Sequence, residues 1–403
     1  MTTLAPATEA ELVEAVASAN AAGRSLELLG RGSKRAMGRP LQVEATLDLS
    51  RFSGVVAYEP NELLLTAGPA TPLAEIEALL AGAGQALAFE PPDFGPLLGA
   101  AAGAGSLGGA IAVNLAGPRR FKAGAARDHL LGFKAVTGGG ARFKSGGRVV
   151  KNVTGYDLSK LIAGSWGTLA AMTELTVKVL PAGETLRTLV LLGLDAVEGG
   201  LAMTAALLSS CEVSGAAWLP AAQARALRID PVAAPGSSVT ALRLEGPEPS
   251  VLARLATLRS LLPKTPPQLV LEPESSRPFW RAVADARGFV GDSRPLWRLT
   301  LTPTSGPQVL HALELPEEDT FLDWGGGLLW VTADRSEALL PRLEAALSRH
   351  GGAATLVRGP AALRASVHQL PSQPPALLAL AKRVKAGFDP KGVFNPGRIY
   401  AGI

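Results

Sequence analysis

An uncharged, glycine-rich run from Phe94 to Pro118 constrains the fold of this chain more than any other segment. Its length is close to the about 20 residues that a membrane-spanning helix needs. The run nevertheless contains seven glycines together with Pro96 and Asn114, which make it a poor apolar rod. Glycine at this density marks backbone that bends sharply or lies close to a ligand. The segment therefore predicts a ligand-binding loop region and argues against a transmembrane helix.

A shorter glycine motif, GRGSK at Gly30 to Lys34, follows a predicted strand. It is not a Rossmann fingerprint, because Arg35 occupies the place of the third glycine, and it does not match the P-loop pattern either. The motif does supply a run of backbone N–H groups, the Ser33 hydroxyl and the positive charges of Arg31 and Lys34. These groups suit a pyrophosphate, although an ordinary turn between two strands explains the glycines equally well.

Two further segments carry candidate binding groups. Gly108 and Gly109 let backbone amides approach a charged ligand, and Asn114 offers an amide to the polar edge of a buried ring. A glycine-rich packing seam in the core is the alternative. Later, Gly155 to Asp157 open a predicted helix whose aspartate suits the helix dipole or serves only as a cap. Gly164 to Thr168 then form a second turn that exposes backbone.

Hydrophobic periodicity predicts an α+β chain of three parts. Thr8 and Glu11 have capping-box spacing ahead of a helix that ends near Ala22. Short strands and turns follow up to Pro181, and units of strand, helix and strand come after it. We expect domains over residues 1–181 and 182–375, and a helix and tail over residues 376–403 that return to the first domain. No internal repeat is visible in the sequence.

Composition excludes several functional classes. The net charge is only +4 and the basic residues are spread out, which argues against nucleic acid as a partner. The single cysteine, Cys211, excludes both a disulfide framework and an iron–sulfur cluster within this chain. The N-terminus shows no secretory signal, so we expect a cytoplasmic protein. No metal site and no catalytic triad are expected, because the four histidines are scattered. They are His129, His311, His350 and His368.

In this order, the three glycine-containing segments resemble the flavin-binding domain of the vanillyl-alcohol oxidase and p-cresol methylhydroxylase (PCMH) superfamily. The terminal FDPKGVFNPGRIY is similar to the closing segment of its 2-hydroxy-acid dehydrogenase branch. NLAGPRR, RVVKNVTGYDLSKL and DWGGGLLW together resemble the E subunits of bacterial glycolate oxidases. The resemblance implies a PCMH-type FAD domain of two subdomains, then an α+β, ferredoxin-like cap domain, with the C-terminal segment docked on the FAD domain.

The resemblance also implies the positions of the bound FAD. The expected pyrophosphate contacts are Gly30, Arg31, Gly32, Ser33 and Lys34 in the first loop and Gly105, Ser106, Leu107, Gly108 and Gly109 in the second. The isoalloxazine is expected near Asn114, Gly117 and Pro118, and the adenine near Gly167, Thr168, Met172 and Thr173. The first loop contains no histidine of the kind that often attaches the flavin in this superfamily, so we expect non-covalent FAD.

The sequence departs from the catalytic members of the branch in its second half. Those members carry H-x-G-D-G-N-x-H and a later E-H-G, whereas this chain has Leu322 to Leu328 in that place and no E-H-G. Arg298 lies on a predicted strand where related enzymes bind the substrate carboxylate, although a surface arginine is the alternative reading.

The resemblance therefore implies the FAD-binding subunit of a glycolate oxidase complex that oxidises glycolate to glyoxylate. Its expected partners are a D-type catalytic flavoprotein and an iron–sulfur subunit that receives the electrons, with any peripheral contact at the inner membrane made through them. Two alternatives remain open: a free-standing FAD-dependent 2-hydroxy-acid dehydrogenase, and a non-catalytic assembly subunit that FAD stabilises.

Overall fold

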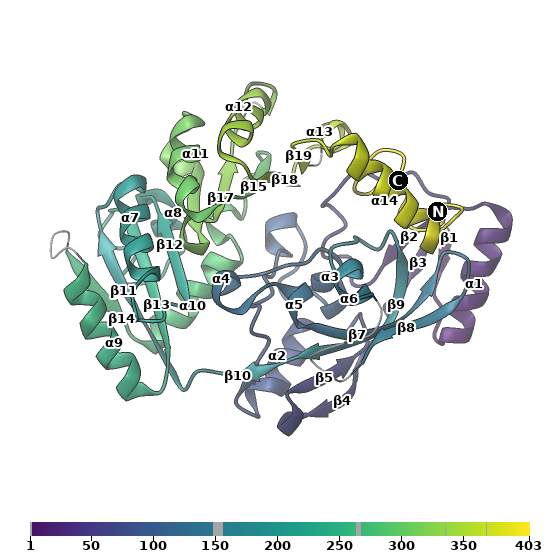
Figure 1. The fold of residues 1–403 in the computed structure, drawn as a ribbon, viewed down its shortest axis with the longest axis horizontal. Coiled ribbons are helices and arrows are strands. Elements are labelled where there is room, and N and C mark those ends of the chain that lie inside the picture. Colours follow the sequence, from purple (N-terminus) through teal and green to yellow (C-terminus); the bar gives the residue numbers. More distant parts are fainter. Residues whose placement is uncertain (1, 148–155, 263–266, 335, 368) are drawn as a thin grey trace.

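The computed structural model describes residues 2–147, 156–262, 267–334, 336–367 and 369–403 (Figure 1). An N-terminal unit, residues 2–181, contains two sheets and one antiparallel pair of two-residue strands from distant parts of the chain. A nine-stranded unit, residues 182–370, contains one continuous sheet. No helix in the described part of the chain is long and apolar enough to cross a membrane. The mixture of helix and sheet confirms the predicted α+β class.

The smaller sheet of the N-terminal unit is parallel and has the strand order β1-β3-β2. Its strands are β1 (Thr2–Leu4), β2 (Leu26–Leu29) and β3 (Ala45–Asp48). Helix α1 (Glu9–Ala22) buries Leu12 and Val16 against it. The predicted cap of α1 is confirmed, since the Thr8 hydroxyl accepts the Glu11 N–H at 3.2 Å.

The larger sheet of the N-terminal unit is antiparallel and has the order β4-β5-β9-β7-β8. Its strands are β4 (Val55–Glu59), β5 (Leu64–Ala67), β7 (Leu130–Thr137), β8 (Arg142–Gly146) and β9 (Ala170–Lys178). Short helices connect these strands: α2 (Leu73–Ala81), α3 (Leu107–Ala112), α4 (Arg120–Ala123), α5 (Ala126–His129) and α6 (Leu158–Ile162). Strands β6 (Gln85–Ala86) and β10 (Leu180–Pro181) pair separately. The uncharged glycine-rich run thus folds into loops and short helical segments, and it forms no helix of membrane-spanning length.

The nine-stranded sheet consists of two β-α-β-β-α-β units with the same strand order. The first unit has the order β14-β11-β13-β12, and the second has β18-β15-β17-β16. All pairs are antiparallel, and β12 and β16 join the two units at a Trp218–Leu322 bridge. The strands of the first unit are β11 (Thr185–Leu192), β12 (Gly215–Leu219), β13 (Val239–Gly246) and β14 (Gln268–Leu271). Those of the second are β15 (Leu296–Thr300), β16 (Thr320–Asp323), β17 (Leu328–Thr332) and β18 (Ala353–Arg358), with β19 (Gln369–Leu370) added at its edge. The expected ferredoxin-like topology is therefore present twice.

Opposite faces of this sheet have different partners. One face packs against four helices in a shared hydrophobic core. They are α7 (Ala196–Leu207), α9 (Glu248–Leu261), α11 (Gly306–Ala312) and α12 (Ser336–His350). The other face, with Leu219, Phe321 and Trp330, shares a core with the N-terminal unit. Helices α8 (Ala221–Ala226) and α10 (Pro273–Ala284) lie on this side. The nine-stranded unit also contains four single 3-10 turns: η3 (Arg287–Phe289), η4 (Pro303–Ser305), η5 (Glu317–Asp319) and η6 (Trp324–Gly326). Two more, η1 (Pro60–Glu62) and η2 (Pro96–Leu98), lie in the N-terminal unit.

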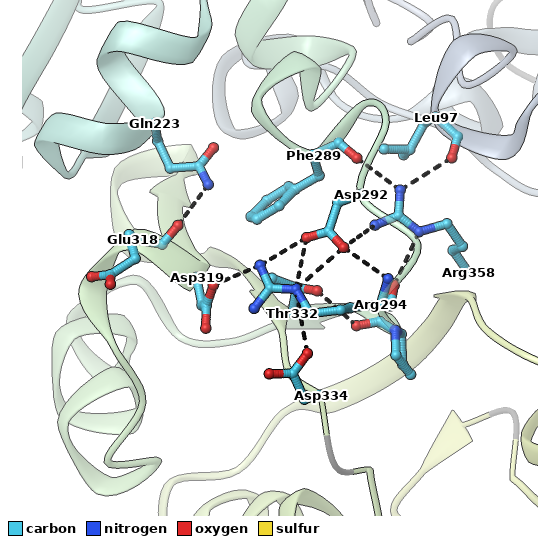
Figure 2. A network of polar contacts seen from close by, with 11 residues as sticks. Leu97, Gln223, Phe289, Asp292, Arg294, Glu318, Asp319, Thr332, Asp334 and Arg358 are labelled. Atoms are coloured by element: carbon cyan, nitrogen blue, oxygen red, sulfur yellow. Dashed lines mark hydrogen bonds and ion pairs between the residues drawn. The ribbon is translucent and has the colours of Figure 1, made fainter.

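Ionic contacts hold the two units together. The buried Arg243 guanidinium donates to both carboxylate oxygens of Glu90, at 2.8 and 3.0 Å. At a second place, shown in Figure 2, Arg358 donates to the carbonyl oxygens of Leu97 and Phe289, and Asp292 pairs with the neighbouring Arg294. Of these contacts, the Arg243–Glu90 pair and the Arg358–Leu97 hydrogen bond cross from the nine-stranded unit to the N-terminal unit.

The C-terminal segment crosses back to the N-terminal unit, so that both chain ends lie close together in Figure 1. After α13 (Ala361–Ser366), helix α14 (Pro375–Phe388) carries the buried Lys385, whose ammonium donates to the Thr168 carbonyl at 2.6 Å. Phe394 then forms a parallel bridge with Leu26 of β2. The tail is thereby attached to the strand that precedes the first glycine loop.

Candidate functional site

A first cavity of about 870 Å³ opens between the end of β2, the start of α3 and the turn before β9. Ten of the residues predicted to contact FAD line it. They are Gly30, Arg31, Gly32, Ser33, Lys34, Ser106, Gly108, Gly109, Gly167 and Met172. Segments separated by more than a hundred residues in the sequence therefore meet around one space, as expected of a ligand site.

Lys34 supplies the positive charge of this cavity. Its side chain is only 9% exposed and donates to the Ser33 hydroxyl at 3.3 Å. Among the described residues, no carboxylate lies within ion-pair distance of its ammonium. Burial lowers the pKa of Lys34 to about 8, and the more distant Asp93 opposes this shift only partly. A buried ammonium without a counter-ion calls for an anionic ligand.

The first glycine loop adds backbone donors beside Lys34. Gly32 has a φ of 75°, which a residue with a side chain rarely adopts. In the described structure, the N–H groups of residues 31–34 make no hydrogen bond to another protein group. A row of free N–H groups next to a lysine forms a nest that fits the diphosphate of FAD. Arg398 supports the loop from behind by donating to the Lys34 and Arg35 carbonyls at 3.3 and 2.9 Å.

The second glycine loop differs from the expectation at Gly108. Its N–H donates to the Pro69 carbonyl at 2.7 Å, and a Cβ at this position would lie 2.5 Å from the Pro69 Cβ. Glycine is therefore required at 108 for packing, and the Gly108 amide is not available to a ligand. The Gly109 N–H donates to the Ser106 hydroxyl at 3.3 Å, and a Cβ at this position would lie 3.2 Å from that hydroxyl oxygen and 3.5 Å from the Lys34 ammonium nitrogen.

Several of the residues predicted to contact FAD do not line this cavity. Leu107 is a core residue, and the Gly105 carbonyl accepts the Leu73 N–H. The Gly117 carbonyl accepts the indole N–H of Trp324 at 2.9 Å, which places Gly117 and the adjoining Pro118 at the contact with the nine-stranded unit. Thr173 donates to Glu9 of α1 at 3.4 Å.

The tyrosine–aspartate helix start is a cap. Asp157 accepts the Lys160 N–H at 3.3 Å, and Tyr156 is 89% exposed. Neither residue lines the first cavity. The preceding Lys151 to Gly155 lie outside the described residues.

A second cavity of about 1470 Å³ adjoins the first, and Val113 and Trp166 line both. Most of its lining residues are apolar, and Thr168 is one of the polar residues among them. A third cavity of about 830 Å³ shares Arg298 with the second and is also lined by Asn114. The three cavities thus share lining residues pairwise and follow one another from Lys34 to Arg298.

Arg298 projects from β15 at the point where the second and third cavities meet. Its guanidinium carbon lies 4.7 Å from the ring centroid of Trp324, a cation–π distance. No ion pair or hydrogen bond of the Arg298 guanidinium is present among the described residues. Burial lowers the pKa of Arg298 to about 10, but the group remains charged at neutral pH. The structure thus places Arg298 in a cavity, and the alternative of a surface arginine is wrong.

Asp323 is a buried acidic group that interacts electrostatically with Arg298. It is 2% exposed, and its Oδ1 accepts the Trp324 N–H at 2.7 Å. Burial raises the pKa of Asp323 to about 7, although Arg243 and Arg298 oppose the shift. In the described part of the chain, no group of three or more His, Cys, Asp or Glu side chains could hold a metal ion.

Two residues of the C-terminal tail that were not predicted from the sequence also line the first cavity. Asn395 lines the first cavity; its Oδ1 accepts the Leu28 N–H at 2.9 Å and its amide donates to the Trp166 carbonyl at 2.8 Å. Arg398 and Trp166 line the same cavity. The motif NPGR, Asn395 to Arg398, is visible in the sequence of the tail. No local sequence pattern shows which loop these residues contact in the fold.

Comparisons with known proteins agree with this geometry. Residues 2–146 match the family model described as an FAD binding domain. Glycolate oxidase subunit GlcE of Escherichia coli is 33% identical over 396 residues, which cover 97% of each chain. Glycolate oxidase subunit GlcD of Bacillus subtilis is 26% identical over 78% of this chain and 71% of its own length.

Solved structures show the same fold at low sequence identity. p-Cresol methylhydroxylase with substrate bound has a TM-score of 0.72 over 99% of this chain and 88% of its own, at 12% identity. Alkyldihydroxyacetonephosphate synthase has a TM-score of 0.68 over 98% and 75%, at 16% identity. The predicted PCMH-type fold and the FAD cofactor are confirmed. The chain belongs to the family of FAD-dependent oxidoreductases that contains the glycolate oxidase subunit GlcE.

Proposed function

We propose that this chain is the FAD-binding subunit of a glycolate oxidase-type complex that oxidises glycolate or a related small 2-hydroxy acid. The observation that carries the proposal is the series of neighbouring cavities, linked by shared lining residues, from the buried Lys34 to Arg298, which has no ion-pair partner among the described residues. One end provides the charge and the N–H donors for a diphosphate. The other end provides a guanidinium for a carboxylate, which it can bind through two parallel hydrogen bonds.

Within this proposal, residues of the first cavity hold the nucleotide part of FAD. Lys34, Ser33 and the loop N–H groups bind the pyrophosphate, and Gly167 and Met172 lie beside the adenine. The apolar second cavity receives the flavin ring next to Val113 and Trp166. The bound flavin would accept the electrons of the substrate C–H bond, and the protein supplies binding, orientation and exclusion of water.

Arg298 orients the substrate in this scheme. Its guanidinium is held against the Trp324 ring, and Trp324 is itself fixed by the hydrogen bond to Gly117. A carboxylate paired with Arg298 therefore has a defined position relative to the second cavity. The residues that catalytic relatives would use for acid–base chemistry have no counterpart in the sequence between Leu322 and Leu328.

The electrons then have to leave through another protein. Cys211, the only cysteine in the sequence, is buried and cannot by itself hold an iron–sulfur cluster. We therefore assign the iron–sulfur relay to a partner subunit, with a D-type flavoprotein as the second partner. The relative GlcD is named as a subunit of a glycolate oxidase, which supports this assembly.

The test is an anaerobic titration of the purified, flavin-containing chain with glycolate, alone and with its D-type partner. We expect visible flavin absorbance in the isolated chain, and its bleaching by glycolate at least in the assembled complex. Bleaching in the isolated chain would favour the free-standing dehydrogenase. Absence of flavin from the chain would contradict the proposal, and full activity of a complex built with a flavin-free variant would favour an assembly subunit.

A further inference from the structure

A second arginine faces the same indole ring as Arg298. The guanidinium carbon of Arg120, at the start of α4, lies 5.9 Å from the ring centroid of Trp324. Arg120 lines the third cavity together with Asn114 and Arg298. Two guanidinium groups from different units of the fold thus meet across one tryptophan.

Neither guanidinium is neutralised within the described structure. Arg120 forms no ion pair with a described residue: the carboxylate of Asp128, whose pKa Arg120 helps to lower, is bound instead by the Lys160 ammonium at 3.2 Å and by the Ala125 N–H at 2.9 Å. Asp323 interacts electrostatically with Arg298, but the two side chains form no ion pair in the described structure, and the Asp323 Oδ1 accepts the Trp324 N–H. Because arginine does not lose its proton in proteins, both groups stay positive and repel each other.

Asn114 completes the polar wall of the third cavity. Its Oδ1 accepts the Arg127 N–H at 2.9 Å, and no described group accepts a hydrogen bond from its amide nitrogen. The cavity therefore presents two guanidinium groups and one amide donor. A site that offers only donors and positive charge binds an anion, and carboxylates match the planar guanidinium best.

We infer that the third cavity is a second carboxylate subsite, and that Arg120 is a specificity-determining residue that favours 2-hydroxy acids with two carboxylates. The inference rests on the proposed function in that Arg298 holds the carboxylate next to the reacting carbon. Glycolate uses Arg298 alone. A longer acid extends past Arg298 into the third cavity, where Arg120 binds the second carboxylate and the repulsion between the two arginines is removed.

Malate and lactate are the probes that separate the two subsites. Both are 2-hydroxy acids, and malate differs from lactate by one additional carboxylate. Their binding to the full-length chain is measured by calorimetry, with both enantiomers of each acid and with flavin content recorded by visible absorbance. We expect malate to bind at least about 10-fold more tightly than lactate, because its second carboxylate forms one additional charge-assisted hydrogen-bonded pair with Arg120.

Three variants test the assignment. Arg120→Gln is expected to reduce malate affinity to that of lactate and to leave lactate binding unchanged, and Arg120→Lys restores part of the preference. Arg298→Gln weakens both acids. Arg127→Gln is the matched control, because Arg127 is exposed, lies close in sequence and lines none of the three cavities.

Equal binding of malate and lactate by the wild-type chain would overturn the inference, and so would a preference that survives in Arg120→Gln. If the Arg120→Gln variant keeps its flavin absorbance, the proposed function stands whether or not this inference fails. Loss of flavin from the wild-type chain would instead contradict the proposed function.

Discussion

The guanidinium of Arg243 forms a bidentate ion pair with the carboxylate of Glu90, at 2.8 and 3.0 Å, across the boundary between the two units of the fold. Arg243 lies on β13 and also contacts the Trp280 ring, 5.0 Å from its centroid. Glu90 in turn accepts the Arg119 N–H at 2.9 Å. This pair sets the position of the cavity series, because the nucleotide end and the carboxylate end belong to different units.

Removing Arg243 is expected to destabilise the protein strongly. Arg243→Met leaves Glu90 and Glu245 without their buried partner, which costs about 3–5 kcal/mol in comparable cases. Chemical unfolding measures the change. The exposed Arg349→Met serves as control and is expected to shift stability by less than about 0.5 kcal/mol. Equal effects of the two substitutions would refute a structural role for the pair.

Asp323 predicts a pH-dependent stability. Because its pKa in the folded state is raised to about 7, the folded protein tolerates the neutral carboxyl and is destabilised by the charged one. The destabilisation is absent below the unfolded pKa near 4, grows as pH rises and is complete above about 7. Asp323→Asn should therefore be more stable than wild type at pH 8, and the difference should shrink toward pH 5. A stability difference independent of pH would show that Asp323 does not titrate in this range.

The neighbouring glycines of the second loop predict opposite outcomes. Gly108→Ala should destabilise the fold, since its Cβ would collide with Pro69. Gly109→Val should leave the fold intact but expel FAD, because its side chain would lie against Ser106 and Lys34 inside the cavity. Circular dichroism and visible absorbance on both variants distinguish the two effects. Flavin retention by Gly109→Val would contradict the position of the cofactor.

FAD is expected to be released on acid precipitation. The first loop offers Arg31, Ser33 and Lys34 and no histidine, so it lacks the side chain expected for covalent attachment. Precipitating the yellow protein with acid should leave the flavin in the supernatant. Colour that stays in the pellet would show a covalent bond and overturn this prediction.

Local patterns in the sequence predicted the elements well, because their determinants lie close together in the chain. Thr8 and Glu11 marked the start of α1, and the strand predicted to carry Arg298 is β15. The motif from Gly30 to Lys34 predicted the loop that lines the positively charged first cavity. Each of these signals needs only a few adjacent residues.

Contacts between distant segments could not be predicted. Asn395 meets Leu28 across 367 positions, and Arg243 meets Glu90 across 153. Position 108 requires glycine because of its close contact with Pro69. In the sequence, a glycine required for packing cannot be distinguished from one required for ligand binding. The doubled β-α-β-β-α-β unit left no sequence repeat, because strand order depends on alternating burial and not on residue identity.

The most direct test of the account is the affinity for FAD as a function of pH, in wild type, Lys34→Met and the exposed control Lys144→Met. Because the Lys34 pKa is lowered to about 8 without ligand, the ammonium that pairs with the pyrophosphate is present below pH 8 and is lost as pH rises through it. We expect wild type and the control to bind FAD tightly at pH 7 and more weakly above pH 8. Lys34→Met should bind at least about 30-fold more weakly at pH 7, as loss of about 2 kcal/mol implies, and should show no transition near pH 8. Wild-type affinity in Lys34→Met would contradict the central claim that this cavity holds the pyrophosphate of FAD.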